Sequence, residues 1–432
     1  MHRRTIFFLI IALATVGVVF SQGYVPGTAL MNQGMFMGGV GLSVIDGNSY
    51  VTVHLRPELA IGKFGIGFEI PLRYHTETGH IRTEDWNDDY DYFRILRYVR
   101  YGHKGETFYT RVGALDATRL GHGFIMNYYN NSLLYDQRKI GLELDVDAKY
   151  AGFEAMTNNL GRAEIFGGRV YYRPLWEMQT PILKNLAIGA TFVTDTDPDA
   201  LDATDDGITE FGFDIELPFI KTSPLQWGIY ADYATINDFG SGTAVGTELQ
   251  MRGIAGVFDL TAQLERRFLG DEFLPGYFGP FYELERYQVD GNTVFRKKDS
   301  LKQAKETHGT FGLLYGHVLN AIQLLGTFER LDDQPNSGRL HLEATLPNTL
   351  PKIAARAMYD RRNIEGFGDA FDFDEDSVAR AGLGYKIYPF LILYGDYVWT
   401  FRFDEAANKY KVQKRFEPQI ALSFTFGVGG GR

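Results

Sequence analysis

The 432-residue chain contains no cysteine and only one long hydrophobic run, and both shortages restrict what it can be. Without cysteine it cannot build a disulfide scaffold, a thiolate metal site, an iron–sulfur cluster or a cysteine nucleophile. A single apolar run excludes a polytopic helical membrane protein. The chain also has fewer basic than acidic residues, with 43 Lys and Arg against 54 Asp and Glu, which gives a net charge of −11. That balance argues against nucleic acid as a partner, because nucleic-acid-binding proteins normally carry a basic surface.

The one apolar run lies at the N-terminus and has the organisation of a signal peptide. A basic stretch, MHRR, precedes an apolar segment from Ile6 to Phe20, and Ser21 offers a small residue before a cleavage point. The run is short for a membrane span, and a core helix or membrane anchor is the alternative. We expect residues 1–21 to be a signal peptide that is removed on export, and residues 22–36 to be a periplasmic N-terminal segment.

The rest of the sequence has a period of two instead of a helical period. Segments such as 64–72 and 211–217 alternate apolar side chains with small or polar ones, which places them on opposite faces of a sheet. The expected strands lie near residues 37–45, 50–61, 63–74, 91–102, 106–114, 137–146, 148–156, 164–173, 185–195, 208–219, 224–234, 244–252, 256–267, 309–318, 321–331, 338–346, 352–361, 377–387, 390–402 and 415–426.

The connections separate a membrane barrel from a secreted β-sandwich or solenoid, which would share this alternation. From the second strand onward, every other connection is tight or contains proline, as at 62–63 and 388–390. The connections between them are mostly longer and polar, as at 115–136, and this asymmetry is typical of outer-membrane barrels. Because backbone groups in lipid must be paired, the sheet must close on itself. We predict an all-β fold, a transmembrane antiparallel up-and-down β-barrel of about 20 strands (18–22), over residues 37–426, with 427–432 as a C-terminal tail.

Aromatic residues gather at the expected strand ends, as they do in the girdles of membrane barrels. The last segment, Arg415–Phe426, is amphipathic and ends in aromatic residues. With its signal peptide, alternating strands and the stretch 92–131, the chain resembles bacterial outer-membrane porin-like β-barrel proteins of an uncharacterised family. This resemblance implies a bacterial outer-membrane location, contact with outer-membrane lipid, and insertion by the barrel-assembly machinery through the last strand.

Charged residues on the faces opposite the apolar ones are candidates for the lining of the lumen. Both signs occur, so we expect a water-filled interior in which opposite charges pair across strands. A ring of like charge would set ion selectivity, whereas a structural network of salt bridges is the plainer interpretation. The candidates are Glu69, Arg73, Arg94, Arg111, Lys139, Glu143, Glu248, Arg252, Asp259, Glu265, Arg380 and Lys386.

Arginines at 94, 97 and 100 are the best candidates for an anion-attracting patch. Arg94 and Arg97 are three residues apart, so they cannot both face the lumen from a regular strand. Either a β-bulge intervenes, or one side chain reaches to a membrane edge.

The acidic loop 195–207 contains the one candidate metal site. Carboxylates are hard oxygen ligands that suit Ca²⁺. Its opening resembles that of an EF-hand loop, but Ala200 stands where that loop requires glycine, and a solvated external loop is the alternative. The candidate calcium ligands are Asp195, Asp197, Asp199 and Asp202. No other cofactor is expected.

Sequence signatures of enzymes are missing from the chain. It has neither Gly-x-Ser-x-Gly nor His-Glu-x-x-His, and its nine histidines do not pair at metal-ligand spacing. His122 lies between two glycines, a context that backbone packing or a bend explains better than catalysis. We predict that the protein is not an enzyme, with a hydrolase at the barrel rim as a third hypothesis.

The loop 268–308 is long enough to be functional, and it contains a possible hairpin that turns at Asp290-Gly291. We expect it to fold inward and constrict the pore rather than project outward. A barrel of about twenty strands is too wide for its side chains alone to fill. We predict an outer-membrane, porin-like channel for passive or weakly selective diffusion of small hydrophilic solutes, with no separate plug domain. A homo-oligomer is a candidate assembly. The alternative is a structural or adhesive barrel with a loop-plugged lumen and an acidic external binding surface.

Overall fold

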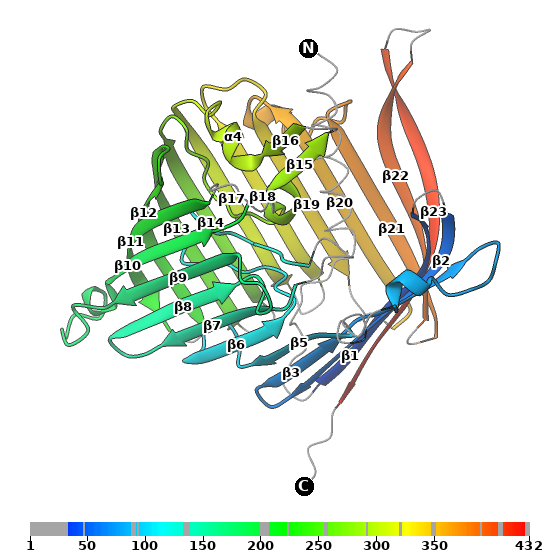
Figure 1. The fold of residues 1–432 in the computed structure, drawn as a ribbon, viewed down its shortest axis with the longest axis horizontal. Helices are drawn as coiled ribbons and strands as arrows, with labels where there is room; N and C mark the ends of the chain where they lie inside the picture. Colours follow the sequence, from blue (N-terminus) through cyan, green and yellow to red (C-terminus); the bar gives the residue numbers. More distant parts are fainter. Residues whose placement is uncertain are drawn as a thin grey trace.

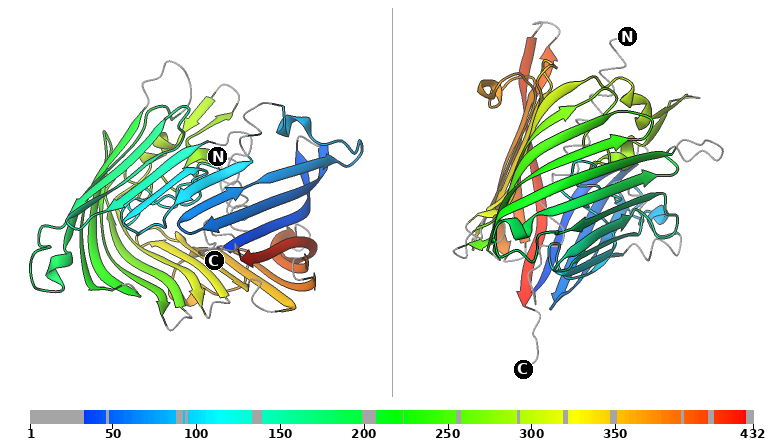
Figure 2. Two further views of the ribbon diagram at one scale, coloured as in Figure 1. Left: turned by 90° about the horizontal axis from the view of Figure 1, so that it is seen from below. Right: turned by 90° about the vertical axis from the view of Figure 1, so that its left-hand side faces the viewer.

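The fold was obtained as a computed structural model, and it is a barrel of antiparallel strands around an interior that holds loops (Figures 1 and 2). The structure describes residues 33–45, 48–87, 92, 95–132, 139–198, 207–222, 224–254, 258–290, 293–318, 322–346, 351–388, 391–404 and 409–427. The predicted signal peptide, residues 1–21, lies outside them.

The barrel wall is made of long strands joined by turns on one side and loops on the other. Its strands are β1 (Gln33–Ile45), β2 (Asn48–Ile61), β3 (Phe64–Phe68), β4 (Ile70–His75), β5 (Leu96–Tyr101), β6 (Phe108–Gly113), β7 (Gly141–Asp147), β8 (Ala151–Thr157), β9 (Ile165–Tyr172), β10 (Ala187–Asp195), β11 (Ile208–Lys221), β12 (Leu225–Ile236), β13 (Ser241–Ile254), β14 (Phe258–Leu269), β17 (Thr307–Val318), β18 (Ile322–Leu331), β19 (Gly338–Leu346), β20 (Ile353–Ile364), β21 (Ser377–Tyr388), β22 (Leu391–Asp404) and β23 (Lys409–Gly427).

Shorter elements lie in the loops. They are the helices α3 (Tyr282–Glu285) and α4 (Lys297–Leu301), the hairpin of β15 (Tyr287–Asp290) and β16 (Thr293–Arg296), and the 3-10 turns η1 (Thr83–Asp85), η3 (Leu183–Asn185) and η4 (Phe367–Asp369). β15 pairs with β16 from Tyr287 opposite Arg296 to Asp290 opposite Thr293, so the predicted hairpin is present. Gly291, at its expected turn, lies outside the described residues. No helix among the described residues is both long enough and apolar enough to cross a membrane.

Pairing of the first strand with the last closes the sheet. Each strand is antiparallel to its neighbours in the chain, and β1 pairs with β23 from Gln33 opposite Gly427 to Val40 opposite Ile420. β3 and β4 both pair with β2 and are two halves of one strand. The 21 strands of the described sheet therefore make about twenty crossings, and the predicted barrel is confirmed.

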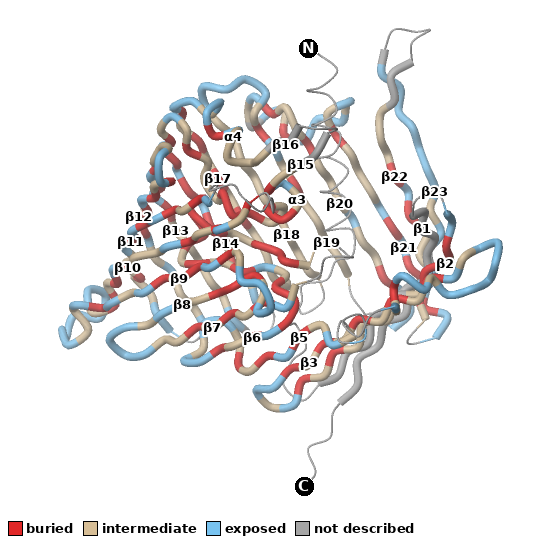
Figure 3. Tube along the Cα trace, in the orientation of Figure 1, coloured by how far each residue is buried: buried red, intermediate tan, exposed pale blue. Residues whose placement is uncertain are grey.

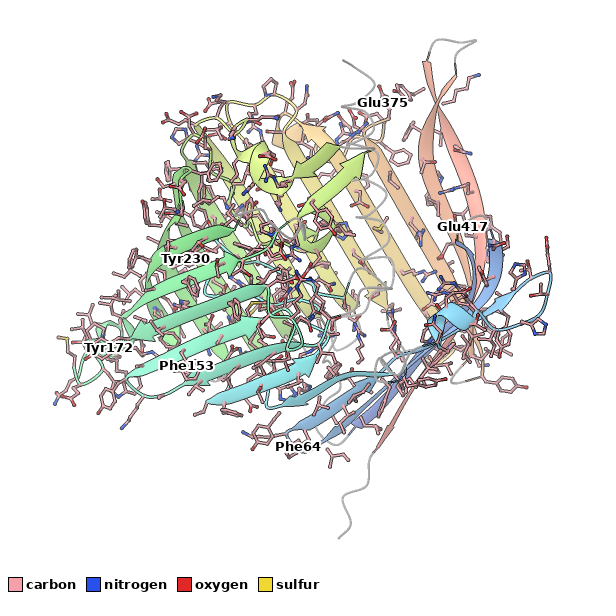
Figure 4. The ribbon with its side chains drawn as sticks, viewed as in Figure 1. Phe64, Phe153, Tyr172, Tyr230, Glu375 and Glu417 are labelled. Carbon is pink, nitrogen blue, oxygen red and sulfur yellow. The ribbon has the colours of Figure 1, made fainter. Side chains whose placement is uncertain are left out.

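Side chains alternate between an apolar outer face and a polar inner face. In β11, Phe211, Phe213 and Ile215 are exposed, whereas Glu210 and Asp214 are buried. Figure 4 labels further outer residues, among them Phe64 and Tyr172, which are also exposed. An apolar exterior around a polar interior is the arrangement of a transmembrane barrel, and it follows from the period of two in the sequence.

Strand boundaries differ from the predicted ones mainly at the ends of the barrel. β1 begins at Gln33 instead of residue 37, and β23 begins at Lys409 instead of 415. β5 covers only Leu96–Tyr101 of the predicted 91–102. The tail residues 428–432 lie outside the described part of the chain.

The hydrophobic core lies inside the barrel, between its wall and two loops. Its buried members include Leu115, Phe124, Met126, Phe278 and Tyr282, all from loops between strands. Buried residues gather on the wall from β5 to β14, whereas β18, β19 and β20 are mostly of intermediate exposure (Figure 3). The interior is therefore packed more tightly on one side than on the other.

Candidate functional site

Two loops fold into the lumen and pack on each other. We call residues 114–132, between β6 and β7, inner loop 1, and residues 270–306, between β14 and β17, inner loop 2. Gly276 N–H donates to the Phe124 carbonyl at 2.7 Å, and Phe278 N–H donates to the Ile125 carbonyl at 3.2 Å. Inner loop 2 therefore folds inward, as predicted for 268–308, but it lies on a second loop that the sequence did not identify as internal.

Inner loop 1 is fixed to the wall through His122. The imidazole stacks on the ring of Tyr230, with centroids 3.8 Å apart and planes within 5°. Its Nδ1 lies 3.2 Å from Asp232 Oδ1, and its Nε2 lies 3.6 Å from Glu216 Oε2. Burial alone would lower the pKa of His122, but the carboxylates of Asp232 and Glu216 raise it to about 10. The cationic imidazole is thus held by two carboxylates of β12 and β11.

The Gly121-His122-Gly123 sequence supports this contact through its backbone. Gly121 and Gly123 have φ values of 54° and 88°, a left-handed region that side chains disfavour. Gly121 N–H donates to Glu154 Oε2 at 2.8 Å, which ties the turn to β8. The two glycines flanking His122 were the sequence signal for this bend.

Arg119 ties inner loop 1 to the opposite wall. Its Nη2 donates to Glu248 Oε2 at 2.9 Å and to Gln263 Oε1 at 3.1 Å. Gln263 Nε2 in turn donates to the His122 carbonyl at 2.9 Å. Lys104, in the turn after β5, donates to the Arg119 carbonyl at 2.8 Å. Inner loop 1 therefore extends across the lumen from β6 to β13 and β14.

Inner loop 2 is fixed by a buried ion-pair network centred on Arg286. Its Nε and Nη2 donate to the two oxygens of Asp195, each at 2.8 Å, and Tyr282 OH donates to Asp195 at 2.8 Å. Glu283, one helical turn earlier, lies 2.9 Å from Lys139 Nζ. The side chains of Asp195 and Arg286 are 0% and 5% exposed, so the pair is shielded from water.

A cluster of arginines lines the wall at β5 and β6. The β3–β5 register shifts beside Gly67, where Tyr98 and then Leu96 are the successive partners. This bulge lets Arg97 and Arg100, three residues apart, both turn inward. Arg94 lies outside the described residues, so the expectation for Arg94 and Arg97 stays a prediction.

The charges of this cluster are matched by carboxylates. Arg97 Nη2 lies 2.6 Å from Asp116, which also binds Arg111. Burial would raise the pKa of the Asp116 carboxyl, but Arg97 and Arg111 lower it below its usual value. The Arg111 guanidinium also lies 4.0 Å above the ring of Tyr98. The arginines are therefore paired, and they hold the start of inner loop 1.

The wall from β19 to β23 also carries paired charges, some of them partly exposed. Arg356 Nε donates to Asp396 at 3.0 Å, and Arg380 lies 3.6 Å from Glu417. The side chains of Arg356, Arg380 and Glu417 are 19%, 20% and 32% exposed, whereas that of Asp396 is fully buried. The described contacts of both inner loops with the wall fall on β5 to β17, on the other side of the barrel.

Most of the predicted lumen candidates lie on the inner face, and the structure pairs many of them. The observed pairs are Glu69 with Arg56, Arg73 with Asp85, Arg111 with Asp116, Lys139 with Glu283, Glu143 with Lys104, Glu248 with Arg119, Glu265 with Tyr230 and Arg380 with Glu417. Lys386 is buried, whereas Arg252 and Asp259 are exposed near the turn that joins β13 to β14. Arg119, His122 and Arg286 were not among the candidates, because loops carry no periodic signal.

The proposed calcium ligands are engaged differently. Asp195 binds Arg286, and Asp197 pairs with Arg162. Asp199 and Asp202 lie outside the described residues. No group of three or more metal-ligating side chains occurs among the residues that the structure describes. Calcium binding by this loop stays a prediction.

Comparisons with known proteins give no family for the chain. No family model and no curated protein sequence matches it. Among solved structures, OccK10 (OpdN) of Pseudomonas aeruginosa is similar over 91% of this chain and 98% of its own, with 10% identity and a TM-score of 0.36. The ferric-catecholate import receptor Fiu of E. coli is similar over 92% and 82%, with 11% identity and a TM-score of 0.34. The outer membrane protein OpdK of Pseudomonas aeruginosa is similar over 91% and 98%, with 8% identity and a TM-score of 0.32. Identity at this level is a likeness of fold alone.

Proposed function

We propose that the protein is a channel of the bacterial outer membrane for small hydrophilic solutes, with an off-centre passage. In this proposal the inner loops fill the lumen along β5 to β17, and solutes pass along β18 to β23. The observation that carries it is the placement of the inner loops, whose described contacts with the wall fall on β5 to β17. On the other side, Arg380 and Glu417 are 20% and 32% exposed.

Charges of both signs favour weak selectivity. On the proposed passage wall, cationic Arg356 and Arg380 pair with anionic Asp396 and Glu417. A ring of one sign would favour ions of the other sign, but paired charges largely cancel each other's field. A passage with such walls supports passive diffusion of small polar solutes rather than strict selection.

The outer-membrane setting belongs to the same proposal. The exposed apolar exterior supports contact with lipid. An N-terminal signal of the kind expected for residues 1–21 supports export, and the last strand supports recognition by the assembly machinery.

Single-channel recording in planar bilayers tests the channel. We expect purified, folded protein to give discrete conductance steps. A variant with both Asp195→Asn and Arg286→Met, which loosens inner loop 2, is expected to give larger steps. If neither protein conducts, the channel proposal is wrong and a structural or adhesive barrel is favoured, since two packed inner loops are also what a plugged barrel requires.

A further inference from the structure

The join between β1 and β23 is shorter than the strands that it connects. β1 pairs with β2 up to Ile45, but its pairing with β23 ends at Val40. β23 pairs with β22 from Lys409 to Leu422, but with β1 only from Ile420 onward. In Figure 1 the upper part of the β22–β23 hairpin rises clear of β1 and β2, which meet it at its base.

Two short edges therefore face each other without pairing. Within the described residues, the β1–β23 ladder includes neither Gly41–Ile45 of β1 nor Arg415–Gln419 of β23, the residues that would be opposite if it continued. We call these two edges the seam. Pro418 lies within it, and a proline has no backbone N–H to offer a neighbouring strand, which is why prolines in sheets favour edges.

The β1–β23 ladder is shorter than a full crossing of the hydrocarbon layer. A tilted barrel strand needs about 9–11 residues to cross the hydrocarbon layer. β1 has 13 residues, which is enough, but only eight of them pair with β23.

The outer face beside the seam contains an apolar cavity. It has a volume of about 760 Å³ and lies over β19 to β23. Small residues form its floor, and larger apolar ones form its sides. The residues that define it here are Ala355, Ala357, Ala381, Gly395, Leu383 and Phe416. Since Phe416 belongs both to the cavity and to the seam, the two lie side by side.

The inner side of the seam is charged. Glu417, labelled in Figure 4, lies on β23 opposite Asp396 and is 3.6 Å from Arg380 and 3.8 Å from Arg415. The side chain of Arg415 is 53% exposed. An apolar cavity on the outside and accessible charges on the inside therefore meet at one gap in the backbone ladder.

We propose that the seam is a lateral passage for an amphiphile with a charged head group and one long hydrocarbon chain. The chain lies in the outer cavity, the head group contacts the charges around Glu417, and the molecule moves between the lumen and the outer leaflet. Backbone groups left without partners in hydrocarbon are costly, and a polar head group or water in the gap would satisfy them. This route goes beyond diffusion of hydrophilic solutes along the barrel axis.

A disulfide across the seam tests the passage, because the chain has no cysteine of its own. The seam variant carries Leu42→Cys and Pro418→Cys, positions that would be opposite if the ladder continued. The control carries Gly38→Cys and Leu422→Cys, which are already register partners. The probe is a fluorescent long-chain fatty acid, and its transfer from the lumen to the bilayer is followed in phospholipid vesicles. Oxidation of the seam variant is expected to reduce transfer to the level of protein-free vesicles, whereas the oxidised control keeps it.

A second variant keeps the test independent of disulfide formation. Ala357→Trp fills the cavity, and Ala190→Trp places the same side chain on the outer face of β10 as a control. A photoactivatable fatty acid is expected to label the wild type and the Ala190 variant near β20, and to lose that labelling in the Ala357 variant. Equal labelling of all three proteins, or equal transfer by the oxidised and reduced seam variant, would overturn the passage. Conductance is measured in parallel, and its absence would contradict the channel proposal without affecting these outcomes.

Discussion

Arg119 and Glu248 are 129 residues apart in the sequence, yet Nη2 of the arginine lies 2.9 Å from Oε2 of the glutamate. Their side chains are 14% and 18% exposed, so the pair is partly shielded from water. It connects the loop after β6 to the wall at β13, on the far side of the lumen. This contact and the His122 contact beside it bind inner loop 1 to the inner wall of the barrel.

Removing the arginine should release inner loop 1. Arg119→Met leaves the partly covered Glu248 carboxylate without its cation, which costs about 1.5–3 kcal/mol for a hydrogen bond between charged groups. We expect lower stability to denaturant in lipid vesicles, together with larger and noisier conductance steps. Arg252→Met on the same strand removes an exposed arginine and should change stability by less than about 0.5 kcal/mol. Equal effects of the two substitutions would show that the Arg119 contact does not hold the loop.

The Asp195–Arg286 pair should behave as a coupled unit. Arg286→Met alone leaves the fully buried Asp195 uncompensated, and we expect a loss of about 3–5 kcal/mol. Adding Asp195→Asn removes that charge and should restore part of the loss. A double-mutant cycle by denaturant unfolding measures the coupling. Additive effects would mean that the two side chains act independently, against the geometry described above.

How far the sequence predicted the structure depends on the element. The wall was predictable because each strand alternates, as Phe211, Phe213 and Ile215 do against Glu210 and Asp214, and a closed sheet follows from the need to pair backbone groups in lipid. The loop contacts were not, because they join positions far apart in the chain that share no period. His122 shows the limit, since its flanking glycines indicated a bend but nothing indicated Tyr230 as its partner.

Docking of inner loop 1 should weaken as the pH rises. The carboxylates of Asp232 and Glu216 raise the pKa of His122 from 6.5 to about 10 when the loop is docked, in spite of burial. A raised pKa means that the contribution of His122 is complete below about pH 6.5 and is lost as the pH rises to about 10. We expect conductance to increase across this window.

A variant without the titrating group provides the control for this pH dependence. His122→Phe keeps an aromatic ring for stacking on Tyr230 but carries no charge. Its loop should dock more weakly than that of the wild type at about pH 7, with no comparable change up to about pH 9. A wild-type conductance that stays constant over the same range would contradict the assigned role of His122.

A glycine on β13 should be required for the His122 contact. A Cβ on Gly246 would overlap the ring of Tyr230, on which His122 stacks. Gly246→Ala should therefore displace Tyr230, lower stability by about 1–3 kcal/mol and loosen inner loop 1. Gly312→Ala on β17 is the matched control, because its nearest neighbour would be 3.8 Å away. The stability of the two variants is compared by following intrinsic tyrosine and tryptophan fluorescence during unfolding.

Charge on the wall from β19 to β23 should set the ion preference of the passage. Arg380 lies 3.6 Å from Glu417, and both are partly exposed, so Arg380→Gln leaves a net negative charge beside the proposed path. We expect the reversal potential in a KCl gradient to shift toward cation preference, and Glu417→Gln to shift it toward anion preference. Because the Debye length falls from about 10 Å at 0.1 M salt to about 3 Å at 1 M, both shifts should shrink as the salt concentration rises. Arg330→Gln on β18, whose side chain alternates with the inward Glu329, is the control and should leave the reversal potential unchanged. If the two lumen variants shift it in the same direction, or not at all, solutes do not pass along this wall.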